Sequence, residues 1–88
     1  MLSLPGMSWS STLARPIRPR DGAPLRTLGN ARAYLLSLPE GEAVRPAWQT
    51  AAALVLAAAE SGDRAAVLAA TDQIERALFV AYRLDMTG

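Results

Sequence analysis

The sequence predicts a mainly α-helical fold: a small three-helix domain with an N-terminal β-hairpin or extended arm. Alanine dominates the apolar residues between positions 43 and 81, and alanine favours helices and is rare in strands. An Asp-Gly pair, Asp21-Gly22, lies between alternating residues in a pattern typical of a β-hairpin. At 88 residues, 51% of them hydrophobic and 19% charged, the chain has room for one folded domain.

The first fourteen residues carry no regular hydrophobic period. We expect an extended segment over 1–14, poorly anchored unless Trp9 or Leu13 docks on the body of the protein, and a single domain over 15–88. The segment has no charged start, and a Pro-Gly pair interrupts its apolar run, so a secretory signal is not expected. Since the sequence also has no apolar stretch of about 20 residues, the length that crosses a membrane, we predict a cytoplasmic protein without membrane contact.

The hairpin is predicted over residues 16–27, and its register depends on the length of the loop. A two-residue loop at the Asp-Gly pair would place Ile17 and Leu25 on opposite faces. A three-residue loop over 20–22 pairs Ile17 directly with Leu25, and it is favoured because burial of one face sets the register. Two prolines in this run remove amide donors, so the ribbon is expected to stand as an isolated strand pair that leans on helices.

Three helices are predicted, and residues typical of helix ends mark their boundaries. Threonine and aspartate accept hydrogen bonds from the free amides of a first turn, proline fits that turn, and glycine or proline ends a helix. The helices are expected over about 28–38, with Thr27 as N-cap and Pro39 as terminator before a turn; over 46–60, with Pro46 in the first turn and Ser61-Gly62 at the end; and over 63–84, with Asp63 as cap.

The second and third helices carry more apolar surface than so small a domain can cover. The second is apolar nearly all round, a profile that predicts burial on most sides. The third leaves Phe79 outside its main apolar stripe, beside Val80 and Tyr82, and these three residues are the predicted interaction surface of a homodimer. The expected core consists of Leu35, Leu38, Trp48, Val55, Ile74 and Leu78, closed at one end by Ile17 and Leu25.

Every basic side chain is arginine, and positive charge gathers in the first half of the chain. Residues 1–39 hold five arginines and one aspartate, a net charge of +4, whereas residues 40–88 hold four arginines and seven acidic residues, a net charge of −3. Arginine binds phosphate through paired hydrogen bonds, although a genome rich in Arg, Ala, Pro and Gly codons would give the same composition. A stripe along the hairpin could contact nucleic acid or another polyanion; its candidates are Arg15, Arg18, Arg20 and Arg26, with Arg32 further along. The structural alternative is a hydrated edge that blocks strand addition.

No set of residues in the sequence indicates catalysis or a bound cofactor. Cysteine and histidine are absent, which excludes disulfides, thiolate catalysis and the usual zinc sites. Carboxylate pairs occur at Asp72/Glu75 and Glu40/Glu42, but a solvated helix face with pairs such as Asp72–Arg76, and a solvated loop, account for them. Neither a Gly-rich phosphate loop nor a nucleophile elbow is present. We therefore predict no enzyme, no catalytic residue, no metal site and no cofactor.

The runs RPIRPRDG, LRTLGNARAYLLSLP, RPAWQ and AAAESGD together resemble a set of small uncharacterised bacterial proteins, over about residues 15–84. The resemblance implies a domain that extends over this whole range, and it brings no activity, cofactor or site. The function expected from the sequence is a non-catalytic, oligomerising module that meets a copy of itself or a protein partner through its apolar helical surface. The alternative is contact with nucleic acid or another polyanion through the hairpin arginines.

Overall fold

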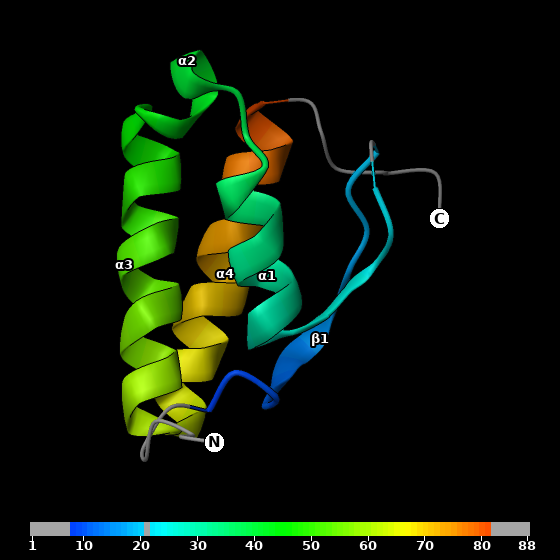
Figure 1. The fold of residues 1–88 in the computed structure, drawn as a ribbon. Helices are drawn as coiled ribbons and strands as arrows, with labels where there is room; N and C mark the ends of the chain where they lie inside the picture. Colours follow the sequence, from blue (N-terminus) through cyan, green and yellow to red (C-terminus); the bar gives the residue numbers. More distant parts are fainter. Residues whose placement is uncertain (1–7, 21, 82–88) are drawn as a thin grey trace, which may run out of the picture.

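Two long antiparallel helices, α3 (Pro46–Ser61) and α4 (Arg64–Val80), lie side by side along the molecule (Figure 1). The computed structural model describes residues 8–20 and 22–81. Gly62 links the two helices with a φ of 66°, a left-handed conformation that glycine adopts without steric cost, and its amide donates to the Ala58 carbonyl at 2.8 Å. Asp63 is the N-cap residue of α4, as predicted, but its side chain makes no capping hydrogen bond. Residues 82–84 of the predicted third helix lie outside the described residues.

The first helix, α1 (Leu28–Leu36), begins at the predicted N-cap and ends two residues before the predicted end. Thr27 and Asn30 form a reciprocal capping box. The backbone amide of Asn30 donates to Thr27 Oγ1 at 3.1 Å, and the backbone amide of Thr27 donates to Asn30 Oδ1 at 3.2 Å. The carbonyl of Ala33 accepts from the Ser37 amide, where the last turn ends. The sequence therefore specifies the start of this helix by local hydrogen bonding alone.

A one-turn helix, α2 (Glu40–Ala43), occupies the place where a turn was predicted. The amides of Glu42 and Ala43 both donate to the Pro39 carbonyl at 2.9 Å, so the proline that ends α1 also starts the next turn. The described residues thus hold four helices instead of the three predicted.

The N-terminal hairpin consists of β1 (Thr12–Ile17) and β2 (Leu25–Thr27), which pair antiparallel. Ile17 pairs with Leu25, the register that the three-residue loop predicts; Asp21, within that loop, lies outside the described residues. At the end of the hairpin away from the loop, Thr12 pairs with Thr27. The two pairings are five residues apart in β1 but only two residues apart in β2, so the register shifts between them. Pro16 lies in this irregular stretch and has no amide to donate, which interrupts the ladder.

The stretch before β1 is anchored to the helices from Ser8 onward. The Ser8 amide donates to the Ala59 carbonyl near the end of α3 at 2.7 Å, and the Gly29 amide of α1 donates to the Trp9 carbonyl at 2.8 Å. Leu13 is 3% exposed, and Trp9 packs against the core. Trp9 and Leu13 therefore dock on the body of the protein, the condition under which anchoring was expected, and β1 begins inside the predicted extended segment.

The core lies where α4 packs between α3 and β1, and α1 packs against α3 and β2. Tyr34 and Trp48 meet there, with ring centroids 6.0 Å apart and ring planes inclined by 49°. Two predicted core residues, Leu35 and Leu38, are only partly buried and pack against the edge of the core. The other predicted core residues are buried as expected: Ile17, Leu25, Trp48, Val55, Ile74 and Leu78.

Within one chain, helix α3 is buried along one side only, and cover of its remaining surface by a second chain stays a prediction. Its buried stripe includes Trp48, Ala51 and Val55, whereas Ala53 and Ala57 on the opposite side are exposed. Only α1, α2 and α4 pack against it among the described elements, and all of them approach from one side. An exposed alanine adds little apolar area, so this face can stay in water.

Candidate functional site

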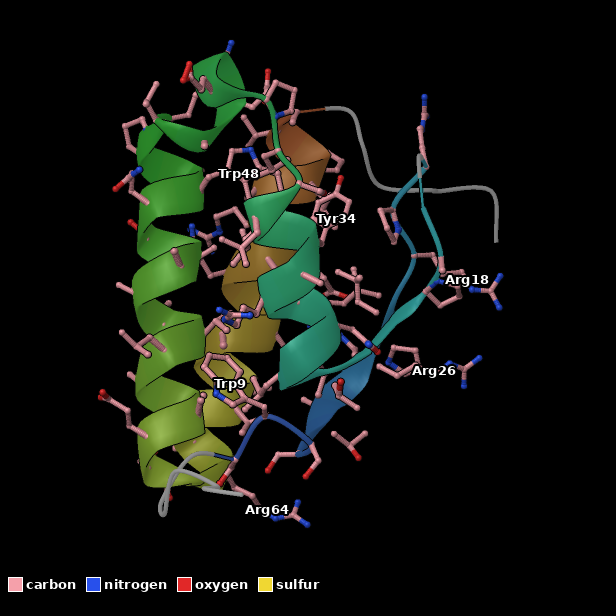
Figure 2. All side chains as sticks on the ribbon, viewed as in Figure 1. Trp9, Arg18, Arg26, Tyr34, Trp48 and Arg64 are labelled. Atoms are coloured by element: carbon pink, nitrogen blue, oxygen red, sulfur yellow. The ribbon has the colours of Figure 1, made fainter. Side chains whose placement is uncertain are left out.

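The hairpin arginines do not form a single stripe. Arg18 and Arg26 extend from the outer side of the hairpin, away from the helices (Figure 2). Arg20 is exposed close to the loop. Arg32 lies on α1, where its guanidinium carbon is 5.5 Å from the centroid of the Trp9 ring, a cation–π distance. Only two of the candidate arginines therefore combine an outward position with the absence of a partner among the described residues.

Arg15 is bound to α4 by its own carboxylates. Its Nε donates to both carboxylate oxygens of Glu75 at 3.0 and 3.1 Å, and its Nη2 donates to Asp72 Oδ1 at 2.6 Å and also to Glu75. The hydrogen bonds to Glu75 and then to Asp72 raise the pKa of Arg15 above its ordinary value. Asp72 pairs with Arg15 in place of the predicted Arg76. Arg15 thus links β1 to α4, and a polyanion that bound it would have to compete with these two carboxylates.

The predicted apolar interaction surface is only partly described. Phe79 and Val80 are each 59% exposed, and Tyr82 lies outside the described residues. Successive residues of a helix point about 100° apart, so Phe79 and Val80 do not share one face of α4. Neither residue lines the two cavities found among residues 8–20 and 22–81.

A groove between α1 and α3 is an apolar feature that the sequence did not single out. It has a volume of about 180 Å³ and is lined by Trp9, Arg32, Leu35, Leu36, Ala52, Val55 and Leu56. Leu36 is 69% exposed and Leu56 is 46% exposed, so two large apolar side chains that line the groove are open to solvent. The pattern that points to it in the sequence is the pair Ala52 and Leu56, four residues apart and beside the buried stripe of α3.

Neither a cluster of metal ligands nor a membrane-spanning helix is found in the part of the chain that the structure describes. Among residues 8–20 and 22–81, no three side chains of the His, Cys, Asp and Glu types gather as metal ligands. In the same part of the chain, no helix combines the length and the hydropathy needed to span a bilayer. Comparisons with protein-family models, with curated proteins and with solved structures found no match. The function is therefore inferred from the surfaces of this chain alone.

Proposed function

We propose that the protein is a non-catalytic interaction module that forms a homodimer through the groove between α1 and α3. The proposal depends on one observation: the groove and two exposed leucines belong to the same patch. Leu36 and Leu56 line the groove and are exposed, whereas Val55 lines it as a buried residue. Exposed apolar side chains that gather around a hollow are typical of a protein–protein interaction site.

A second copy is the favoured occupant because one patch carries both halves of a complementary contact. In a two-fold dimer the same surface meets itself, so a leucine that protrudes from one protomer needs a hollow on the other. Leu56 of one protomer can fill the groove of its partner while the partner's own leucine fills the first groove. The volume of about 180 Å³ is sufficient for a leucine side chain together with part of its neighbour.

The composition of the core supports association. Six of its buried residues are alanines, which contribute little apolar area each: Ala31, Ala51, Ala58, Ala59, Ala70 and Ala77. A domain of this size has a narrow margin of stability, and burial of exposed leucines at an interface adds to it.

Sedimentation equilibrium on the Leu56→Gln variant tests the dimer. A glutamine in the groove would have to lose its hydration against apolar side chains, so we expect the apparent mass to fall from that of a dimer to that of one chain over a micromolar concentration range. Leu68→Gln is the matched control, because Leu68 is also 46% exposed but lies on α4, outside the groove.

Two results would contradict this interface. A wild-type protein that sediments as a monomer at high micromolar concentration excludes the dimer. A dimer that resists Leu56→Gln but dissociates on Phe79→Ala would move the interface to the C-terminal part of α4, the region that the sequence indicated.

A second candidate function is contact with a polyanion through the outer side of the hairpin. It is favoured by one observation, the common outward direction of Arg18 and Arg26 (Figure 2). Two arginines can neutralise two phosphates, which gives weak and strongly salt-dependent binding.

Fluorescence anisotropy of a labelled random duplex, measured at several salt concentrations, tests this candidate. Replacement of both arginines, Arg18→Ala with Arg26→Ala, should lower the slope of log K against log salt by about 2, since each phosphate contact contributes about 0.9. The control Arg45→Ala with Arg76→Ala removes the same charge from the helices. Equal loss of slope in both double variants would show that net charge alone governs binding and would reject a hairpin site.

A further inference from the structure

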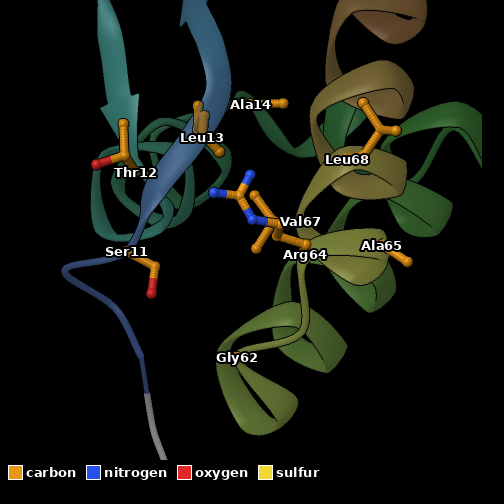
Figure 3. A pocket seen from close by; sticks show the side chains of 9 residues that line it. All are labelled: Ser11, Thr12, Leu13, Ala14, Gly62, Arg64, Ala65, Val67 and Leu68. Carbon is orange, nitrogen blue, oxygen red and sulfur yellow. The ribbon is translucent and has the colours of Figure 1, made fainter.

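A second cavity lies between β1 and the first turns of α4, away from the α1–α3 groove (Figure 3). It has a volume of about 620 Å³, within the range of about 300–1,000 Å³ usual for small-molecule sites. Its lining combines one cation with hydroxyl groups and an apolar wall. The residues are Ser11, Thr12, Leu13, Ala14, Gly62, Arg64, Ala65, Val67 and Leu68.

Arg64 supplies the charge of this cavity. Its side chain extends from the first turn of α4 toward β1 (Figure 3). Within the described residues it has no carboxylate partner, whereas Arg15 on the neighbouring strand is held by Asp72 and Glu75. Asp63 precedes Arg64 but does not line the cavity. An unneutralised guanidinium at the edge of a hollow favours an anionic ligand, and its planar fork matches a carboxylate or phosphate.

The apolar side chains that line the cavity determine which chemical groups fit beside the charged end of a ligand. Leu13 and Val67 are 3% and 8% exposed, and Leu68 adds a half-exposed side chain beside them. These side chains present hydrocarbon, so they favour an apolar body behind the charged group. Ser11 contributes a hydroxyl that can donate to an oxyanion, whereas the Thr12 side chain extends away from Arg64 (Figure 3).

Gly62 lines the cavity at the link between α3 and α4, and this link is packed closely. A Cβ atom built on Gly62 would lie 3.1 Å from Ser8 Oγ, so the N-terminal stretch packs directly on the link. The cavity is lined by segments far apart in the sequence: residues 11–14, the α3–α4 link and the first two turns of α4.

We propose that this cavity binds a small organic oxyanion with a short apolar body, held by Arg64 at its charged end and by Leu13, Val67 and Leu68 along its chain. This site is independent of the proposed dimer, because none of its lining residues belongs to the α1–α3 groove.

Titration of the full ¹⁵N-labelled chain with hexanoate, followed by amide chemical shifts, tests the site. We expect saturable shifts at residues 11–14 and 62–68. Arg64→Gln should weaken hexanoate binding about tenfold, the loss expected when one charge-assisted hydrogen bond is removed. Arg76→Gln, an exposed arginine further along the same helix, is the matched control and should leave the affinity unchanged.

Two further probes separate the charged end from the apolar body. Hexylammonium has the same chain with the opposite charge, and it should cause no saturable shift at these residues. Inorganic phosphate should bind more weakly than hexanoate because it gains nothing from the apolar wall. The proposal fails if hexylammonium binds as well as hexanoate, if phosphate binds as tightly, if Arg76→Gln weakens binding as much as Arg64→Gln, or if no amide of the cavity shifts.

Discussion

At the scale of single residues, Thr71 has a role that its sequence context hides. It is the one fully buried polar side chain among the described residues, with 0% exposure. Its hydroxyl accepts from the Ala14 amide of β1 at 3.1 Å and donates to the Val67 carbonyl one turn earlier at 2.8 Å. The same hydroxyl thus donates a hydrogen bond within α4 and accepts one that links α4 to β1.

Replacement of this hydroxyl by a methyl group should destabilise the protein. In Thr71→Val the shape is kept, but the Ala14 amide loses its acceptor, so the free energy of unfolding should fall by about 1–2 kcal/mol. Urea denaturation followed by circular dichroism measures the change. The matched control is Thr50→Val on the exposed side of α3, which should change stability little. Equal effects of the two substitutions would mean that the bond to Ala14 contributes nothing.

The sequence could not identify Thr71 or the partner of Arg15, because both depend on contacts across 57 or more residues of chain. A threonine in an apolar helix has the same local appearance whether it faces water or a strand. Arg15 has the local appearance of the hairpin arginines beside it, and only the fold brings Glu75 within reach. The sequence therefore shows which side chains are present, but it does not show which of them form contacts with one another.

At the scale of elements, local features were predicted well. The Thr27 cap, the Gly62 terminus and the Ile17–Leu25 register each depend on residues within a few positions of one another, so the sequence contains their physical causes. The helix α2 was missed because the turn and the single helical turn that follow Pro39 differ by only one or two hydrogen bonds.

The candidate interface shows the same division between local pattern and tertiary placement. The all-round apolar profile of α3 correctly indicated apolar surface in excess of the described cover, since Leu56 remains 46% exposed. The sequence could not show which part would form a groove, because that depends on where α1 and Trp9 come to lie against α3. The expected surface was consequently placed on the third predicted helix, at Phe79, Val80 and Tyr82.

At the scale of the whole molecule, the fold joins the positively charged first half of the chain to the negatively charged second half. Arg15 bridges them through Asp72 and Glu75, and the Ala14 amide adds a neutral bond beside this pair. The ions are partly exposed, with 45% of the Arg15 side chain open to solvent, so water and salt screen their attraction. Apolar packing of Leu13 and Ile17 therefore holds the hairpin more firmly than charge does.

The attachment of β1 to α4 also determines an order of events in folding. The α3–α4 pair closes through a link of two residues, Gly62 and Asp63, whereas Ala14 and Thr71 must meet across 57 residues. We expect the helical pair to form in the transition state and the strand to dock afterwards. In stopped-flow kinetics, Ala57→Gly, a probe of α3 that costs about 1 kcal/mol, should slow folding, whereas Thr71→Val should mainly speed unfolding. The reverse assignment would mean that the hairpin nucleates the fold. On the ribosome the consequence is a delay: β1 is synthesised well before α4, the helix that it packs against, so this strand can dock only after α4 has emerged.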